Sequence, residues 1–202
     1  NTLGGLPALD RMVNAFFMSV TARTAGFNTV DYHATADSTD FLTVLLMSVG
    51  GSPGSTAGGL KTTTFAVLVL AAVARLRGRQ LASVWNRTLP QETVQRSVGL
   101  FVLGFVVVTL GILLFAVDQL PPLHPSEHGN FLAYMFEAVS AFNTVGLSMG
   151  VTAGLTGFSK FMAVVLMYVG RVGPLTVGAA ISLQREATND QFRYAYEDVI
   201  IG

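Results

Sequence analysis

The feature that most constrains this chain is a tripeptide pattern that recurs 120 residues later. Thr24-Ala25-Gly26 and Thr144-Val145-Gly146 each follow an apolar stretch of helix size, and each leads into another apolar stretch. The same shift superposes further identical residues without a gap, namely Phe16 and Phe136, Phe41 and Phe161, Leu46 and Leu166, Met47 and Met167, Val49 and Val169, and Gly50 and Gly170. A repeat of this length is too long for a solenoid unit and suits a duplicated membrane module.

Composition places the chain in a membrane. Apolar residues make up 51% of the 202 residues and charged residues only 12%, which leaves too little polar surface for a water-soluble globule. From Ser97 to Val117 the chain runs for 21 residues without a charge. As a helix with a rise of about 1.5 Å per residue, this segment is about 30 Å long, the thickness of a hydrocarbon core. The sequence therefore predicts an all-α membrane protein with a spanning helix at 97–117.

Two other apolar segments are interrupted. The run 158–183 carries Arg171 in its middle and is broken by Pro174 and several glycines, which predicts a spanning helix with a local irregularity. The stretch 41–74 instead contains two short apolar pieces around the glycine-rich run 50–59. Neither piece spans a bilayer alone. Together they predict one broken helix whose irregular link lies at membrane depth, where protein or water must satisfy its backbone groups.

The distribution of charges predicts the orientation. Five arginines and a single acid, Glu92, precede the 97–117 helix, which is typical of a cytoplasmic segment; the arginines are Arg75, Arg77, Arg79, Arg87 and Arg96. The loops 28–40 and 118–129 carry acids but no Lys or Arg, so the Thr-x-Gly segments are expected to open outward, and a mildly acidic mouth suits a cation. The chain has no cysteine, and its three histidines, His33, His124 and His128, fall in these outer loops, so redox and zinc chemistry are not expected.

A short helix is predicted before each Thr-x-Gly segment, at 10–22 and at 130–142, and neither is long enough to span a membrane. Such a helix, entering from the outer side, directs the negative end of its dipole at the pore axis, equivalent to about half a charge. Backbone carbonyls of a short extended loop can replace the water shell of a potassium ion, and glycine reaches the backbone angles that such a loop needs. The pattern therefore predicts two ion-pore loops.

Three stretches carry a resemblance to a known family: Thr24-Ala25-Gly26-Phe27-Asn28, Asn143-Thr144-Val145-Gly146-Leu147, and the glycine-rich run 51–59. With these motifs the chain resembles the Ktr/Trk/HKT potassium transporters, and most closely the bacterial KtrB-type membrane subunits, over nearly all of its length. Members of the family carry four helix/pore-loop/helix units around one pore. The resemblance implies that this chain is the C-terminal half of such a polypeptide, whose N-terminal half is missing here.

The resemblance also implies four segments. Residues 1–74 are expected to form the third pore unit, with its pore helix, filter loop and broken inner helix, and residues 75–96 a cytoplasmic connection. Residues 97–183 are expected to form the fourth pore unit. Residues 184–202 are expected to be a cytoplasmic tail, and their end, Tyr-Glu-Asp-Val-Ile-Ile-Gly, resembles the end of KtrB chains.

Residue by residue, the resemblance implies a site. The expected potassium filter comprises Thr24, Ala25, Gly26, Phe27, Asn143, Thr144, Val145, Gly146 and Leu147. The expected gate below it comprises Gly51, Ser52, Pro53, Gly54, Ser55, Thr56, Ala57, Gly58, Gly59, Lys61 and Arg171. Neither loop keeps the full Thr-Val-Gly-Tyr-Gly of tetrameric potassium channels, because Phe27 and Leu147 replace the tyrosine, and a looser selectivity is expected.

Function and partners follow from the same resemblance. It implies potassium uptake across a bacterial plasma membrane by a multi-pass protein that is not an enzyme. Potassium is the expected substrate; no covalent cofactor and no other metal are expected, and sodium dependence stays open. The expected partners are a second copy in a homodimer, membrane lipid, the missing N-terminal half, and a cytosolic KtrA-like ring of nucleotide-binding subunits that docks on 75–96 and the tail. A net charge of zero argues against a nucleic-acid partner.

Three charged residues can be interpreted from physics alone. Arg171 lies about 20 Å into its run, where a lone charge costs at least about 2.5–3.5 kcal/mol. The 120-residue shift aligns it with Gly51, so the loop carbonyls are expected to accept its donors. We hypothesise that Arg171 and the loop block the pore until the loop moves; the simpler alternative is an arginine that snorkels to an interface. Lys61 is expected to satisfy carbonyls or to reach water, and Glu137 to bond to loop backbone and brace the filter.

Three other functions match parts of the sequence. Gly50-x-Ser52-x-Gly54 fits the nucleophile elbow of serine hydrolases, but every histidine lies in an outer loop and no strand precedes the motif. The glycines before Lys61-Thr62 resemble a phosphate-binding loop, but the required Gly-Lys pair is missing. An alternating-access cation transporter is the stronger rival, although its repeats are often inverted, whereas both Thr-x-Gly segments are expected on the outer side. The sequence does not choose between channel-like and coupled transport.

Overall fold

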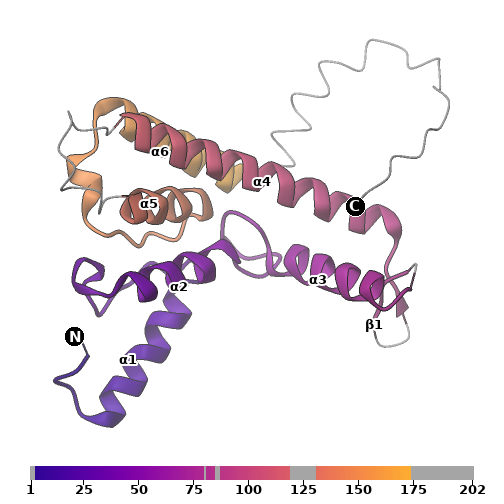
Figure 1. Ribbon diagram of the computed structural model, residues 1–202, viewed down its shortest axis with the longest axis horizontal. Coiled ribbons are helices and arrows are strands. Elements are labelled where there is room, and N and C mark those ends of the chain that lie inside the picture. The colour runs from indigo at the N-terminus through magenta and orange to yellow at the C-terminus, as the bar shows by residue number, and fades with distance from the viewer. Residues whose placement is uncertain (1–2, 80, 85–86, 119–130, 174–202) are drawn as a thin grey trace.

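The computed structural model describes residues 3–79, 81–84, 87–118 and 131–173, and these residues are mostly helical (Figure 1). The elements, in chain order, are α1 (Ala8–Thr21), η1 (Tyr32–Ala34), α2 (Asp37–Ser48), α3 (Thr62–Leu76), β1 (Ser83–Val84), β2 (Arg87–Thr88), α4 (Gln91–Asp118), α5 (Phe131–Asn143), η3 (Val151–Gly154) and α6 (Gly157–Val172). The two short strands form an antiparallel hairpin in which Ser83 lies opposite Thr88. The architecture agrees with the all-α class expected from the sequence.

Helix α4 has 28 residues and contains the whole predicted span 97–117. Within the described ranges it is the one helix that is long and apolar enough to cross a membrane by itself. It begins directly after Pro90, whose fixed φ suits a helix start and whose carbonyl accepts a hydrogen bond from Thr93 N at 3.1 Å. Its first turns are polar and carry an ion pair between Arg96 and Glu92 at 2.5 Å. The apolar part of the helix therefore starts where the sequence predicts.

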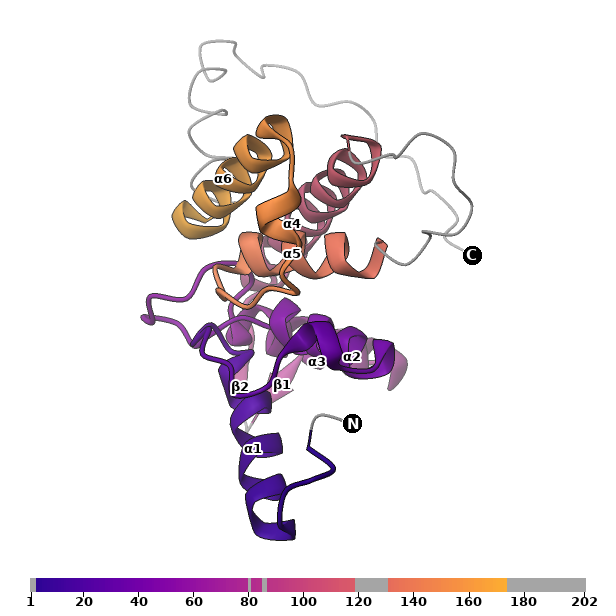
Figure 2. The same cartoon turned by 90° about the vertical axis from the view of Figure 1, so that its left-hand side faces the viewer.

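Helix α5 is the centre of the structure. It is only 13 residues long, yet nine of them are buried, including Phe136 and Phe142. It contacts α2, α4 and α6, and in Figure 2 it lies with α4 and α6 above the layer formed by α1, α2 and α3. A helix that is apolar on nearly all sides is stable only when it is surrounded, and these three helices surround it.

The 120-residue repeat of the sequence is also a repeat of the backbone. Helices α2 and α6 begin at Asp37 and Gly157, and each is preceded by a short 3₁₀ helix, η1 or η3, at matching positions. Positive φ angles recur at the same spacing in the two Thr-x-Gly segments. The ends of α1 and α5 depart from this spacing by two residues, because α5 continues to Asn143. Similar sequence stretches therefore adopt the same helix, loop, 3₁₀ helix and helix order.

Helices α2 and α3 lie end to end in Figure 1 and are separated by the loop 49–61. The two pieces have 12 and 15 residues, so neither reaches the length of a spanning helix. α3 packs on α4, whereas α2 packs on α5, so the two pieces rest on different parts of the second repeat. The link between them contacts the second Thr-x-Gly segment directly, through a hydrogen bond from Gly58 to Thr144.

Helix α1 projects away from the other helices in both views (Figures 1 and 2). Its large apolar side chains are uncovered: Leu9 and Phe16 are each 73% exposed and Met12 is 72% exposed. Further large apolar side chains are exposed on α4 and α6. A surface this apolar is not typical of a protein in water and fits contact with lipid or with more protein.

Several predictions from the sequence lie outside the described residues. The run 158–183 is described only to Gly173, where α6 has ended and φ is 91°. Pro174, the rest of that run and the tail 184–202 are not described, and neither are His124 and His128.

Close packing of α4 on α6 gives a first prediction. A Cβ atom placed on Gly111 would lie 2.7 Å from Cδ1 of Leu166 on α6, so Gly111→Val is expected to lower the free energy of unfolding by about 1–3 kcal/mol. The measurement is thermal or denaturant unfolding of the full-length polypeptide in detergent, followed by circular dichroism. Gly99→Val on the same helix is the matched control, because nothing lies within 4 Å of a Cβ there. Equal effects of the two substitutions would contradict this packing.

Candidate functional site

The two Thr-x-Gly loops share an unusual backbone. Both threonines have positive φ, 68° at Thr24 and 52° at Thr144, and the glycines that follow have φ of 77° and 92°. Positive φ is uncommon for a β-branched residue and costs about 1–3 kcal/mol, so it persists only where the surroundings hold the chain in place. The sequence predicts the need for glycine at Gly26 and Gly146, but it does not predict the left-handed threonines.

Each loop is held against the end of the helix that precedes it. In the first loop, Ala25 N donates to Thr21 O at 3.1 Å and the Thr21 hydroxyl donates to Phe27 O at 2.5 Å. In the second, Val145 N donates to the carbonyl of Ser140 at 2.9 Å, and the Ser140 hydroxyl donates to the Leu147 carbonyl at 2.6 Å. The same pattern is therefore built in both repeats from a hydroxyl in the last turn of the helix.

These bonds divide the expected filter residues into two groups. The carbonyls of Phe27 and Leu147 accept from hydroxyls and so are turned toward their helices. Among the described residues, the carbonyls of 24–26 and 144–146 accept no hydrogen bond. Six main-chain oxygens without partners, on two loops at the negative ends of two helices, are suited to attract a cation.

The two loops meet at their glycines. A Cβ atom on Gly146 would lie 3.5 Å from Gly26 Cα, and one on Gly26 would overlap the carbonyl oxygen of Val145. A side chain at Gly26 would push the loops apart. The structure thus brings together two segments that are 120 residues apart in the sequence.

The loop 49–61 lies against the second Thr-x-Gly loop and α6. Gly58 N donates to Thr144 Oγ1 at 3.0 Å, and Gly59 N donates to Gly170 O at 3.0 Å. The side chain of Arg171 donates from Nη1 to Thr56 O. All three bonds join the loop to the second repeat, so the glycine-rich stretch and Arg171 lie together, as the sequence indicated.

At three positions around these contacts there is no space for a Cβ atom, so only glycine fits. A Cβ on Gly58 would lie 2.6 Å from Thr144 Oγ1, and a Cβ on Gly59 would overlap the side chain of Asn143. A Cβ on Gly170 would overlap the carbonyl of Phe142. By contrast, nothing lies within 4 Å at Gly54, in the exposed tip of the loop, although its φ of 81° also favours glycine.

Several other polar groups of the loop form hydrogen bonds within the loop itself. Gly50 N donates to Leu60 O at 2.9 Å and Thr62 N donates to Gly51 O at 3.1 Å. These two bonds join the beginning of the loop to its end. Lys61 Nζ donates to Ala57 O at 2.5 Å and to a second loop carbonyl at 3.4 Å. Of the two interpretations of Lys61, the one in which it satisfies loop carbonyls therefore agrees with the structure.

An open cavity of about 640 Å³ lies between α5, the second Thr-x-Gly loop and α6. Thr144, Gly146 and Arg171 all line it, together with Glu137 and Tyr168. Expected filter residues and the expected gate arginine therefore border one space. Within the described ranges Arg171 is exposed and has no carboxylate partner, and the bond to Thr56 O joins it to the loop.

Two polar groupings were not predicted from the sequence. Asp118 at the end of α4 accepts from the hydroxyls of Thr156 and Ser159 at the start of α6, the latter at 2.5 Å, and so joins the two helices. Asn143 donates to Val139 O at 3.0 Å, while its Oδ1 atom is buried without a hydrogen-bond partner in the described structure. Thr156 and Ser159, three residues apart before an apolar run, are a signal that indicates the start of α6 but not its partner Asp118.

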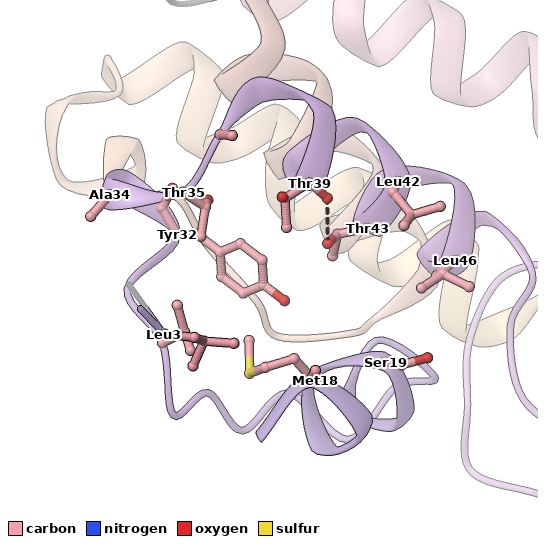
Figure 3. A pocket seen from close by; sticks show the side chains of 13 residues that line it. Leu3, Met18, Ser19, Tyr32, Ala34, Thr35, Thr39, Leu42, Thr43 and Leu46 are labelled. Atoms are coloured by element: carbon pink, nitrogen blue, oxygen red, sulfur yellow. Dashed lines mark hydrogen bonds between the residues drawn. The ribbon is translucent and has the colours of Figure 1, made fainter. Parts of the chain in front are cut away.

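A second cavity, of about 450 Å³, lies between α1 and α2 (Figure 3). The hydroxyl of Tyr32 points into it and has no hydrogen-bond partner among the described residues, while the ring packs on Phe136 of α5 at 5.0 Å between centroids. Burial raises the pKa of Tyr32, so the hydroxyl keeps its proton. None of the expected filter or gate residues lines this cavity, so the cavity is separate from the candidate site at the two Thr-x-Gly loops.

Comparison with known proteins gives a consistent result. The family model described as "TrkH: Cation transport protein" matches residues 2–191. The chain is 39% identical over 194 residues to the potassium/sodium uptake protein NtpJ of Enterococcus hirae, covering 96% of this chain and 42% of that protein. It is 38% identical over 175 residues to the Ktr system potassium uptake protein B of Bacillus subtilis, covering 87% of this chain and 38% of that protein.

A solved structure shows the same fold. The crystal structure of the potassium transporter TrkH from Vibrio parahaemolyticus matches 89% of this chain and 39% of its own chain, with a TM-score of 0.73 and 21% identity. The chain thus spans about two fifths of the length of the relatives it matches.

The contact between Gly59 and Asn143 gives a second prediction. Gly59→Ala is expected to release the loop from the second repeat, because the methyl group overlaps Asn143 and the φ of 66° disfavours alanine. Hydrogen exchange of the amides at 58 and 59, followed by mass spectrometry on the full-length polypeptide, should become faster by about tenfold or more, as expected for a loss of about 1–3 kcal/mol. Gly154→Ala, at an open position, serves as the control. Equal protection of the loop in both variants would contradict the contact.

Proposed function

The chain belongs to the TrkH family of cation transport proteins, and from this premise we propose that it forms part of a pathway for potassium uptake across a cell membrane. The proposal rests on one observation above the others. Two loops in a strained backbone, each at the C-terminal end of a helix, meet with six carbonyls that have no partner among the described residues. Carbonyl oxygens in this arrangement can exchange with the water shell of a potassium ion.

The proposed filter consists of residues 24–27 and 143–147. In it the carbonyls of 24–26 and 144–146 face the ion, whereas the carbonyls of Phe27 and Leu147 anchor the loops to their helices. The dipoles of α1 and α5 favour a cation at this point by about half a charge each. Potassium is the substrate in this proposal, and no other cofactor is needed.

The proposed architecture is a set of helix/pore-loop/helix units around one pore. Residues 1–74 supply the third unit with its broken inner helix, 75–96 the cytoplasmic connection, 97–183 the fourth unit and 184–202 the cytoplasmic tail. The 120-residue repeat of elements supports two units in this chain. The share of the relatives that the chain covers leaves room for two more units in an N-terminal half, and that half would cover the exposed apolar face of α1.

The proposed gate is the loop 51–59 with Lys61 and Arg171. Support comes from the bond between Arg171 and Thr56 O and from the cavity that Arg171 shares with Thr144 and Gly146. A guanidinium held below the filter repels a cation, and the loop adds bulk. Displacing the loop removes both obstacles. Lys61 has a supporting part, because it holds together the loop carbonyls on which the loop's shape depends.

The proposed setting is a bacterial plasma membrane, crossed several times by the whole polypeptide. Support comes from the apolar helix α4 and from the names of the relatives, which describe uptake proteins. A homodimer and a cytosolic KtrA-like regulatory ring are proposed partners, with the arginine-rich segment 75–96 as the docking surface. The printed name of the Enterococcus hirae relative includes sodium, so sodium dependence of uptake should be tested as well.

Substitution of Gly146 tests the filter. In cells without other potassium uptake systems, the full-length polypeptide is expected to support potassium uptake, and Gly146→Val is expected to reduce its rate by about tenfold or more. The reason is that a branched residue is strained at φ of 92° and would disturb the contact with Gly26. Gly154→Val, in open space on η3, is the control, with membrane expression measured for both variants. Normal uptake by a well-expressed Gly146→Val variant would contradict the filter.

Substitution of Arg171 tests the gate. Arg171→Ala is expected to raise potassium flux under conditions in which the unmodified protein is closed, because the charge and the bond to Thr56 O are both lost. Lys160→Ala is the matched control: Lys160 is a cation on the same helix and donates to Ala153 O at 3.2 Å, away from the loop. Flux through proteoliposomes is the measurement. Identical flux and closure in the Arg171→Ala and unmodified proteins would rule out the gating role.

A further inference from the structure

Glu137 is a buried acid in the middle of α5. Its side chain is on the most enclosed helix of the structure, and the residue is 8% exposed. A carboxylate in such a place is costly unless it accepts several hydrogen bonds. It lies one turn before Ser140, so the two side chains are on the same face of the helix.

The Glu137 carboxylate accepts hydrogen bonds from three donors on one short segment, 148–152. Oε1 accepts from the Ser148 hydroxyl and from Met149 N, the latter at 3.2 Å, and Oε2 accepts from Thr152 Oγ1 at 3.0 Å. The segment is also bonded to itself, because Gly150 N donates to Ser148 Oγ at 2.9 Å. Hydrogen bonds to a charged acceptor are about twice as strong as neutral ones, so this is a firm attachment.

The segment held by Glu137 begins directly after the second Thr-x-Gly loop. Ser140 binds the loop itself through Val145 N and the carbonyl of Leu147. Glu137 then binds the chain from 148 to 152. Together Ser140 and Glu137 fix both the loop and its exit to one face of α5. The carbonyls of 144–146, which have no partner among the described residues, lie next to this fixed stretch.

The first repeat has no equivalent attachment among the described residues. The position that matches Glu137 is Phe17, which is 38% exposed, and the position that matches Ser148 is Asn28. The Asn28 side chain donates to Val30 O at 3.3 Å, within its own loop rather than to α1. The two loops are therefore held to different extents, although their backbones are alike.

We propose that Glu137 is a positioning residue for ion selectivity, which holds the second loop open at the size of the preferred cation. The proposal rests on the function proposed above. Selective filters depend on the size of the carbonyl cage or on the number and field of its oxygens, and either property changes when a loop is free to contract. Without the attachment, the carbonyls 144–146 can close around a smaller ion, so sodium competes better with potassium.

The experiment measures the ratio of potassium to sodium permeability in proteoliposomes containing the full-length polypeptide. Glu137→Ala is expected to lower this ratio by about tenfold, which corresponds to about 1.4 kcal/mol of differential binding. Glu137→Gln is expected to lower it by about threefold, because the amide keeps the shape and two of the contacts but not the charge. Thr152→Val, which removes one donor, should give a similar intermediate loss.

Asp118→Asn is the matched control. Asp118 also accepts from two hydroxyls, but these lie at the start of α6 and not beside the filter loop. This variant is expected to lower thermal stability and to leave the permeability ratio unchanged. A merely structural role for Glu137 would make the two carboxylates behave alike.

The outcomes separate this inference from the function on which it rests. Potassium flux in the unmodified protein with an unchanged ratio in Glu137→Gln and Thr152→Val would overturn the inference alone. An equal drop in the ratio for Asp118→Asn would also overturn it, because general destabilisation would then explain the effect. Absence of potassium flux in the unmodified protein would overturn both proposals.

Discussion

Hydrogen-bond satisfaction of irregular backbone inside the protein is the constraint on which the rest of this structure depends. Lipid offers no partners, so a loop at membrane depth has to find them in protein or in an enclosed water path. The proposed architecture places the loop 49–61 at such a depth. Its hydrogen-bond partners are backbone groups at its own two ends, the side chain of Lys61, and Thr144 and Gly170 of the second repeat. Among the described residues, the carbonyls of 24–26 and 144–146 accept no hydrogen bond, and they lie on the two Thr-x-Gly loops, which meet at Gly26 and Gly146. In the proposed function, a dehydrated cation would satisfy these six groups.

The short helix α5 makes this arrangement possible. Because it is surrounded by α2, α4 and α6, it is a rigid support, and it carries Glu137 and Ser140 on the face toward the loop. Glycines allow the close approaches around it, at Gly170 against Phe142 and at Gly104 near the same phenylalanine ring. Sites that must hold sub-ångström geometry are most precise when they are built on regular elements, and here the strained loop is attached to one.

Much of the fold could be predicted from the sequence, because its determinants are local or periodic. The uncharged run 97–117 predicts α4 from length alone, and the 120-residue shift predicts the matching starts of α2 and α6. Gly26 and Gly146 predict the positions of positive φ. The left-handed Thr24 and Thr144 could not be predicted, since threonine avoids that region and only tertiary contacts hold it there. Nor could the bonds from Asp118 to α6, because no periodicity relates residues about 40 positions apart.

Thr144 ties the proposed filter to the proposed gate. Its main chain carries one of the unpartnered carbonyls, and its hydroxyl is the acceptor for Gly58 N. When the loop moves, the hydroxyl loses this donor, and a backbone angle held at φ of 52° loses one of the contacts that stabilise it. The net contribution of one hydrogen bond to stability is only about 0.5–1.5 kcal/mol. The strain energy of a left-handed threonine is of similar size. The two effects are therefore comparable. Under the proposed function, a displacement of the loop would change the filter as well as the path below it, and the open and closed gates would not select ions equally.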